Sequence, residues 1–187
     1  MNTIIVHGSI RTIVDAPSPT RCRLRNGSYA PCSPVNEQCS TPFAGPTPKF
    51  HVMDKSCLMN DPNGPLFDPV HMLYHIFFQD HLALPGGVGP VWAHAVSKDL
   101  AHWARLPVAL WNDELYDSLA IYTGSATVTA DGDIFLVYPG ICNKTLWSNC
   151  STGTNLAVAL PANRSDPLLR EWRKLSSNPV VNNTQRE

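Results

Sequence analysis

The sequence lacks a long hydrophobic run and an excess of either charge. No apolar stretch approaches the roughly 18–20 residues that a membrane-spanning helix requires. Its 14 lysines and arginines nearly balance its 15 aspartates and glutamates, which leaves a net charge of −1. A near-neutral chain has no electrostatic attraction for nucleic acid or for an anionic membrane. We therefore expect no nucleic-acid partner and no membrane partner.

The chain also lacks any long segment with the 3.6-residue period of an amphipathic helix, so we predict no long helices. With 187 residues, of which 43% are hydrophobic and 16% are charged, it has the composition of one globular domain with a core. Residues 1–48 are rich in Pro, Ser and Cys and show no periodicity, which predicts an irregular leader. Over residues 49–187, short apolar segments alternate with turn signals, which predicts an all-β domain.

No CxxC pair occurs among the six cysteines, at positions 22, 32, 39, 57, 142 and 150, which argues against a zinc-finger site. An even number of cysteines is typical of disulfides in an oxidising compartment. Cys142 and Cys150 are close enough in sequence to close a small loop, and free buried thiols are the alternative. His71 and His75 have the spacing of helical metal ligands, but they lie in a strand pattern without a third ligand. We therefore expect no metal site.

No signal peptide is visible, because the apolar run at residues 4–6 is very short and has neither a positive start nor a cleavage site. Five N-x-[ST] sequons nevertheless favour secretion, and three of them fall between residues 143 and 163. We expect a secreted, cell-wall or vacuole-like location. Two explanations account for the absent signal peptide: either the true N-terminus is missing from the sequence, or export is not the fate of this product. The sequons begin at Asn26, Asn143, Asn149, Asn163 and Asn182.

Turn dipeptides divide the β region into hairpins. Asp68-Pro69 predicts a turn between residues 66–67 and a strand over 72–79. Asp131-Gly132 predicts a second hairpin, between strands over 125–129 and 134–138. Two further strands are expected over 91–96 and 155–160.

A faint internal repeat relates residues 94–108 to residues 157–180. Each segment has a strand followed by Asp, Leu, Trp, a basic stretch, Leu and Pro-Val, and Trp103 and Trp172 are 69 positions apart. Strand units that recur at a long period suggest propeller blades. The spacing exceeds a typical blade repeat of about 40–50 residues, so long loops must fill the difference. Chance similarity is the alternative.

The stretch with the most chemical content runs from Leu58 to Gly64. Pro62 fixes φ after Asp61, and Asn63 and Gly64 tolerate positive φ. We predict a tight turn that carries one exposed carboxylate, that of Asp61. Taken alone, this is also the pattern of an ordinary surface turn.

Four further blocks follow residues 59–64 in order: Tyr74–Gln79, Val91–Leu100, Tyr122–Thr127 and Gly132–Tyr138. Together the five blocks resemble glycoside hydrolase family 32, the family of invertases, inulinases and fructosyltransferases, over about residues 50–180. The resemblance implies a five-bladed β-propeller, usually followed by a β-sandwich, with a funnel-shaped site on the propeller axis. This chain would hold the first blades.

The resemblance gives five residues an expected role. Asp61 matches the family's nucleophile, which attacks the anomeric carbon of a β-fructosyl unit and forms a covalent intermediate that is released to water or to another sugar. Asn60 and Gln79 match residues that contact the substrate. Tyr122 and Thr123 match an aromatic–hydroxyl pair that lines the fructose pocket. The implied substrates are sucrose and fructans, and no metal or organic cofactor is implied.

The sequence departs from the family pattern in its carboxylates. A retaining glycosidase needs an acid/base about 5 Å from the nucleophile. The family carries this group on a Glu-Cys motif and a transition-state stabiliser on an Arg-Asp-Pro motif, and neither motif occurs in residues 1–187. We therefore expect a truncated propeller that contains the nucleophile without its partners. Asp166 does not replace the stabiliser, because it falls where the repeat places Asp99, and Glu114 and Glu171 match no family acid.

The aromatic residues around the expected pocket also differ from the pattern. Leu58 stands where many relatives have Trp, Tyr122 replaces a usual Trp or Phe, and residues 86–90 lack a pocket tryptophan. Trp92 and Trp103 are expected to pack the blades rather than to touch substrate. Sucrose or fructan as substrate, and hydrolysis or fructosyl transfer as reaction, therefore stay open.

Two other functions fit parts of the pattern. A catalytically inactive propeller that binds fructosides, or that regulates an active relative, would account for the missing acid/base. A related five-bladed family that acts on other sugars, such as the arabinosidases, also uses inward carboxylates. Residues 60–64 favour the fructosidases.

Overall fold

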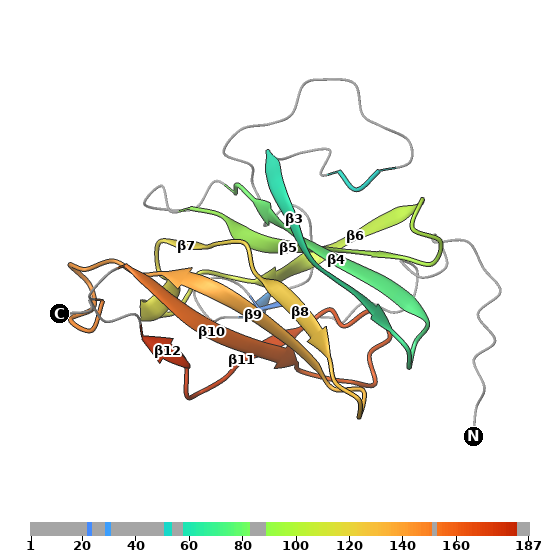
Figure 1. The fold of residues 1–187 in the computed structure, drawn as a ribbon. Coiled ribbons are helices and arrows are strands. Elements are labelled where there is room, and N and C mark those ends of the chain that lie inside the picture. Colours follow the sequence, from blue (N-terminus) through green and yellow to red (C-terminus); the bar gives the residue numbers. More distant parts are fainter. Residues whose placement is uncertain are drawn as a thin grey trace.

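The computed structural model describes residues 22–23, 29–30, 51–53, 58–82, 89–150 and 153–182. Within these ranges the regular structure is almost all strand, and the one helix is a single 3₁₀ turn, η2 (Leu115–Asp117). No described helix is long and apolar enough to cross a membrane. Figure 1 shows the strands gathered in two main sheets. The prediction of an all-β chain without long helices is confirmed for these residues.

Most of the predicted leader, residues 1–48, lies outside the described residues. Its described part is a short antiparallel pair, β1 (Cys22–Arg23) with β2 (Tyr29–Ala30). The side chains at positions 22, 26, 32, 39 and 57, which include four of the six cysteines and the first sequon, also lie outside the description.

The first main sheet is an antiparallel meander in the order β3 (Met59–Asp68), β4 (Leu73–Asp80), β5 (Val91–Ser97) and β6 (Trp103–Leu110). The predicted hairpin and the strand expected over 91–96 are confirmed. Between β3 and β4, the Asp68 carboxylate accepts a hydrogen bond at 3.0 Å from the backbone N–H of Val70, which stabilises the turn. Every residue of β5 is buried, because this strand lies between β4 and β6.

The second main sheet is built around β9 (Ile134–Ile141) and β10 (Thr154–Pro161). β7 (Ala120–Ile121) and β8 (Ser125–Val128) follow one another along β9, and β11 (Trp172–Lys174) and β12 (Val181–Asn182) lie along the far side of β10. The predicted hairpin between β8 and β9 and the strand over 155–160 are confirmed. A disulfide between Cys142 and Cys150 closes the loop between β9 and β10, so the disulfide alternative holds for this pair.

The predicted internal repeat is a repeat of the two sheets. Trp103 begins β6 and Trp172 begins β11, so each tryptophan starts a strand at one end of the strand order of its sheet. Leu100 and Leu169, each three residues before its tryptophan, both have positive φ, at 63° and 46°. The two sheets are therefore equivalent units in succession, as the blades of a propeller are.

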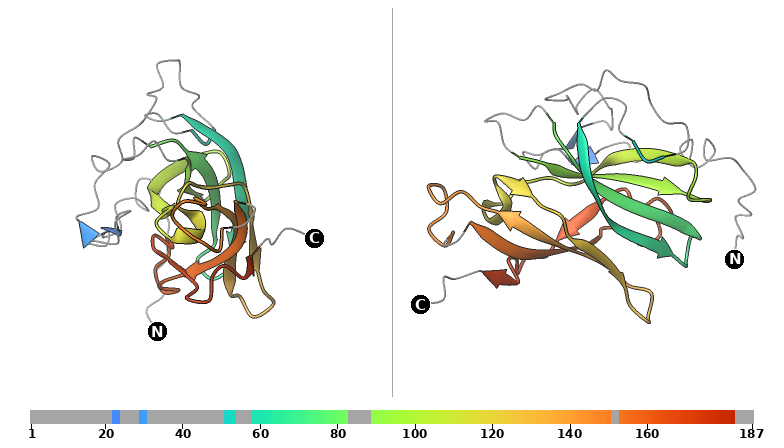
Figure 2. Two further views of the ribbon diagram at one scale, coloured as in Figure 1. Left: turned by 90° about the vertical axis from the view of Figure 1, so that its left-hand side faces the viewer. Right: turned by 45° about the horizontal axis from the view of Figure 1, so that its top comes forward.

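The hydrophobic core lies between the two sheets. Phe77 of β4 meets Trp172 of β11 edge to face, with 5.4 Å between ring centroids, and the ring of Trp92 lies 6.0 Å from that of Tyr138 in β9. Trp92 is fully buried, which agrees with its expected role in packing the blades. Figure 2 shows that both sheets are strongly twisted where they pack together.

The opposite face of the second sheet is also apolar. Successive residues of a strand point to opposite faces, and along β9 and β10 the residues that alternate with the core residues are only half-buried. A sheet with two apolar faces suits a position between two neighbouring blades. These half-buried residues are Phe135, Val137, Pro139, Leu156, Val158 and Leu160.

Two histidines are buried in the first sheet as a hydrogen-bonded pair. His75 Nδ1 lies 2.9 Å from His94 Nε2, and the two residues are 1% and 0% exposed. Burial lowers the pKa of His75 to about 4 and lowers the pKa of His94 well below its ordinary value. Both rings are therefore neutral in the folded protein at neutral pH.

We expect this pair to make the fold less stable as the pH falls below about 6.5, the ordinary pKa of histidine. The unfolded rings take up protons there, whereas the folded rings exclude them until the pH reaches their lowered pKa values, about 4 for His75. The contribution is thus fully present above pH ~6.5 and falls by roughly 2.7 kcal/mol per pH unit for the two rings together.

Urea unfolding at several pH values between 7 and 5 measures this contribution. Asp117 has the opposite effect on the free energy of unfolding: it makes the fold more stable as the pH falls through this range, because burial raises its pKa to about 6. The histidine contribution is therefore taken as the difference between the wild type and a His75→Leu/His94→Leu variant. A difference that stays constant over this pH range would contradict the assignment of neutral buried rings.

Candidate active site

The segment that carries Asp61 is an irregular strand. Residues 59–68 pair with β4, but the register shifts between Asn60 and Pro62, and Asp61 bulges out there with a φ of 43°. The prediction of a tight turn over these residues is wrong. Both flanks continue in the sheet, and Pro62, which has no N–H to donate, lies where the hydrogen-bond ladder is interrupted. The predicted exposure of Asp61 is confirmed.

Positive φ angles fall on Asp61 and on Gly64, at 43° and 53°, and not on Asn63. Asn63 instead folds its side chain back, and its Nδ2 donates a hydrogen bond at 2.8 Å to the backbone carbonyl of Asp61. Asn63 is 4% exposed, so this contact supports the bulge from the buried side of the strand. The bulge is thus a fixed feature that directs the carboxylate away from the sheet.

Four of the five predicted site residues form one row of hydrogen bonds. Thr123 Oγ1 donates to Asp61 Oδ2 at 2.6 Å, and Gln79 Nε2 donates to Thr123 Oγ1 at 3.0 Å. Asn60 Nδ2 donates to Gln79 Oε1 at 2.8 Å. Asn60 and Gln79 face each other on β3 and β4, whereas Thr123 lies between β7 and β8 of the second sheet. The row therefore joins the two sheets at the bulge.

The Asp61 carboxylate is held in its ionised form. The hydrogen bond from Thr123, and after it the one from Asn60, keep the pKa of Asp61 below its ordinary value, against a small opposing effect of desolvation. An exposed carboxylate that is ionised and fixed by donors can act as a nucleophile or can stabilise a neighbouring positive charge.

A Thr123→Val substitution tests the hydrogen bond to Asp61. Valine has nearly the same shape as threonine but cannot donate, so we expect the pKa of Asp61 to rise towards its ordinary value. The residue is exposed, so the free energy of unfolding should change by no more than about 0.5 kcal/mol. Carboxyl ¹³C NMR titration of both proteins measures the shift. An unchanged or lowered pKa would show that Thr123 does not control this carboxylate.

The fifth predicted residue, Tyr122, lies in a break between β7 and β8. Its backbone N–H donates to the Pro139 carbonyl at 2.9 Å, and its carbonyl accepts a hydrogen bond at 3.1 Å from Trp92 Nε1. Its side chain points outward, since the residue is 49% exposed. Gly124 is the last residue of the break, and a Cβ at this position would overlap the Val137 carbonyl, so only glycine lets the chain enter β8 here.

His81 belongs to the same cluster and was not predicted. Its Nε2 lies 2.6 Å from Asn60 Oδ1. Residues two apart in an extended chain point to the same side, so the spacing of His81 from Gln79 is a sequence signal that could have found it. Its contact with Asn60, 21 positions earlier in the chain, cannot be read from that spacing.

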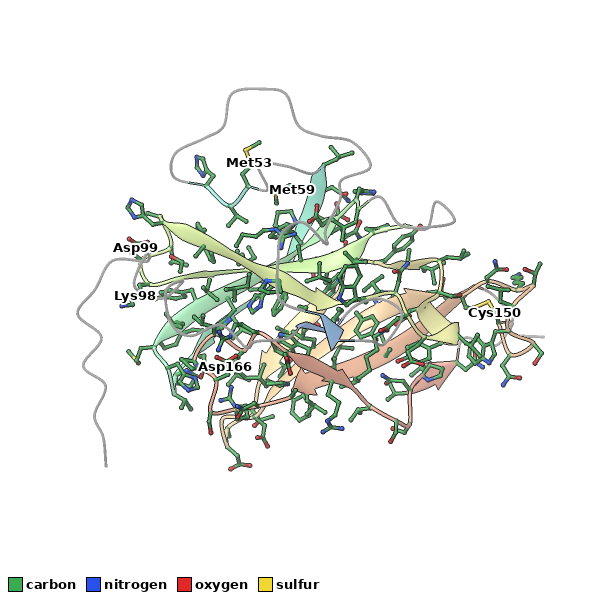
Figure 3. All side chains as sticks on the ribbon, turned by 180° about the vertical axis from the view of Figure 1, so that it is seen from behind. Met53, Met59, Lys98, Asp99, Cys150 and Asp166 are labelled. Atoms are coloured by element: carbon green, nitrogen blue, oxygen red, sulfur yellow. A yellow bond between two sulfur atoms is a disulfide. The ribbon has the colours of Figure 1, made fainter. Side chains whose placement is uncertain are left out.

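Asp166, which we did not expect to be catalytic, stabilises a turn. Its carboxylate accepts hydrogen bonds from two backbone N–H groups that follow it and pairs with Arg170 Nε at 2.9 Å. Asp99 likewise accepts from two following backbone N–H groups. In Figure 3, Asp99 and Asp166 lie towards the left of the view, and Met59, at the start of β3, lies nearer the top.

His71 and His75 do not face a common site. His71 Nδ1 lies 2.8 Å from Asp68 Oδ2, and His75 is paired with His94. In the part of the chain that the structure describes, no group of three or more His, Cys, Asp or Glu side chains could hold a metal ion.

Known proteins share this fold and this part of the sequence. The model of the glycosyl hydrolases family 32 N-terminal domain matches residues 51–187. An acid beta-fructofuranosidase of Vicia faba is 43% identical over 134 residues, which cover 71% of this chain and 19% of that protein. A sucrose:sucrose 1-fructosyltransferase of Festuca arundinacea is 41% identical over 132 residues, with 71% and 19% covered. The chain thus spans about a fifth of the length of these curated relatives.

Solved structures agree with the sequence matches. Fructan 1-exohydrolase IIa from Cichorium intybus has a TM-score of 0.61 at 35% identity, over 71% of this chain and 23% of that chain. A variant of the same enzyme in complex with 1-kestose has a TM-score of 0.62 at 34% identity, over 73% and 24%. The two sheets are therefore consecutive blades of a β-propeller, and the chain belongs to glycoside hydrolase family 32.

Proposed function

We propose that the protein to which these two blades belong cleaves β-fructosyl linkages in sucrose or fructans by a retaining mechanism, with Asp61 as the nucleophile. The observation that carries the proposal is the Asp61 carboxylate itself, which is exposed on a bulge and receives a hydrogen bond from Thr123 at 2.6 Å. A retaining glycosidase needs one carboxylate that is ionised and free to attack a carbon atom.

The side chains around Asp61 suit a fructosyl unit. Asn60 and Gln79 offer amide groups, and Thr123 offers a hydroxyl, which together match the polar rim of a sugar. Tyr122 offers an exposed ring that can cover an apolar sugar face. In this proposal the same donors hold Asp61 in place for the attack.

The reaction then runs in two displacements. Asp61 attacks the anomeric carbon of the fructosyl unit, and the bond to the oxygen of the departing sugar breaks as an acid protonates that oxygen. A water molecule or a sugar hydroxyl next attacks the same carbon, gives its proton to the acid/base and frees Asp61. We assign the acid/base and the stabilising acid to other parts of the full-length protein, because Asp99 and Asp166 are engaged in turns.

We further propose that the protein functions in an oxidising compartment that leads to the cell wall or the vacuole. The Cys142–Cys150 disulfide and the sequons at Asn143, Asn149 and Asn163 support this location. A vacuolar acid beta-fructofuranosidase of Arabidopsis thaliana, 43% identical over 134 residues, is among the relatives.

Product analysis of the full-length protein tests the proposed reaction. We expect sucrose or 1-kestose to yield free fructose if water is the acceptor, and longer fructosylated sugars if a sugar is the acceptor. Binding of 1-kestose without any turnover would instead favour a fructoside-binding module. Release of arabinose from arabinan, with no reaction on fructosides, would favour the arabinosidase-like alternative.

A further inference from the structure

Four hydrogen bonds in a row connect His81 to Asp61. His81 Nε2 lies 2.6 Å from Asn60 Oδ1, and Asn60 Nδ2 lies 2.8 Å from Gln79 Oε1. Gln79 Nε2 lies 3.0 Å from Thr123 Oγ1, which lies 2.6 Å from Asp61 Oδ2. Asn60 and Gln79 each direct the amide oxygen to one neighbour in the row and the amide nitrogen to the other. The Thr123 hydroxyl accepts from Gln79 and donates to Asp61.

The direction of this row is fixed by chemistry. An ionised carboxylate only accepts hydrogen bonds, so the Thr123 hydroxyl must donate to Asp61. Its oxygen is then free to accept only from the NH₂ group of Gln79, which turns the Gln79 oxygen towards Asn60. By the same step the Asn60 oxygen faces His81 and needs a donor there.

We infer that His81 is a positioning residue whose Nε2–H starts a one-way row of hydrogen bonds that ends on the Asp61 carboxylate. The inference rests on the proposed role of Asp61 as nucleophile and deepens it. His81 acts on Asp61 through Asn60, which also hydrogen-bonds Asp61 directly, and along the row through Gln79 and Thr123. It does not itself touch the reacting atoms.

The row explains why a histidine at this position matters. Hydrogen bonds that follow one another in one direction strengthen each other, so a donor at the start makes Thr123 a better donor at the end. Without His81, the Asn60 oxygen loses its partner and the amide can rotate, which disturbs Gln79 next. The Asp61 carboxylate then receives a weaker hydrogen bond and is less well placed for attack.

NMR tests the row without any use of enzymatic activity. Ring ¹⁵N spectra of the full-length protein should show His81, in its neutral form, with the proton on Nε2. Carboxyl ¹³C titration should show a higher pKa for Asp61 in His81→Leu than in the wild type. A neutral His81 ring with its proton on Nδ1 would overturn the inference, because Nε2 could then only accept.

Kinetics of the same variants test the consequence for catalysis. We expect His81→Leu to lower kcat/KM about 10-fold, because one link of a hydrogen-bonded network is lost. His81→Gln, which can again donate to Asn60, should recover activity to within about threefold of the wild type. The acidic limb of the pH profile of kcat/KM should move to higher pH in His81→Leu, because Asp61 must be ionised to react.

His102→Leu is the matched control. His102 also pairs with an aspartate, Asp99, at 2.7 Å, but it lies in the turn between β5 and β6, at the end of the first sheet remote from Asp61. Its removal should change neither kcat/KM nor the pH profile. If His81→Leu behaves like His102→Leu, the inference is wrong. If the wild type turns over no fructoside, the proposed function fails, and the NMR experiment still decides whether the row exists.

Discussion

Replacing Asp61 with asparagine should lower the turnover of sucrose or 1-kestose by the full-length protein at least about 10⁴-fold, on the scale seen when an enzyme loses its nucleophile. Asparagine has the shape of aspartate and can still accept the hydrogen bond from Thr123, so the bulge and the pocket should persist. It cannot form the covalent fructosyl intermediate, because a neutral amide is a poor nucleophile. Initial rates at saturating substrate measure the loss.

Two controls separate lost chemistry from lost structure. Asp131→Asn changes an exposed aspartate in the turn between β8 and β9, and its turnover should stay within about twofold of the wild type because surface changes away from a site have little effect. Asp61→Asn itself should still bind 1-kestose, which calorimetry can measure. If Asp61→Asn keeps wild-type turnover, Asp61 is not the nucleophile.

Replacing Lys174 with methionine should lower the free energy of unfolding by about 3–5 kcal/mol. Lys174 Nζ donates to the Trp111 carbonyl at 2.6 Å and to Asp113 Oδ1 at 2.8 Å, and it also pairs with Asp117. The side chains of Lys174, Asp113 and Asp117 are 8%, 2% and 0% exposed. Methionine would leave two buried carboxylates without their cation.

The position of this cluster explains why its loss should affect stability so strongly. Trp111, Asp113 and Asp117 belong to the segment that connects the two sheets, and Lys174 lies on β11, at one end of the strand order of the second sheet. Burial raises the pKa of Asp117 to about 6 even though Lys174 opposes this shift. Lys174 therefore links β11 of the second sheet to the segment that connects the first sheet to the second.

Urea unfolding of the full-length protein, followed by tryptophan fluorescence, measures the change. Lys144→Met is the control, because Lys144 is exposed in the disulfide loop and its loss should change the free energy of unfolding by no more than about 0.5 kcal/mol. A loss of less than about 1 kcal/mol for Lys174→Met would show that the buried carboxylates find other partners or become protonated.

The strands were predictable because alternation and turn dipeptides are local signals. Asp68-Pro69 and Asp131-Gly132 marked two hairpins that the structure contains. The bulge at Asp61 was not predictable in the same way, because proline, asparagine and glycine indicate a turn and a bulged strand equally well. The deciding contact, pairing of both flanks with β4, joins residues up to 21 positions apart.

The candidate site was predictable only in part. Five of its residues came from the family resemblance, and the structure links four of them, Asn60, Asp61, Gln79 and Thr123, in one row of hydrogen bonds. His81 was missed because its partner lies on another strand. The buried cluster of Lys174 was missed for a related reason: sequence periodicity assigns lysine and aspartate to the surface, and only the tertiary fold shows that they compensate each other.

The most direct test of the account is to trap the covalent intermediate. The full-length protein is mixed with an activated fructoside that reacts quickly in the first displacement, quenched in acid and digested, and the peptides are examined by mass spectrometry. We predict one fructosyl group attached to the peptide that contains Asp61, at that side chain. A fructosyl group on a different carboxylate, or products with inverted anomeric configuration and no adduct, would contradict Asp61 as the nucleophile.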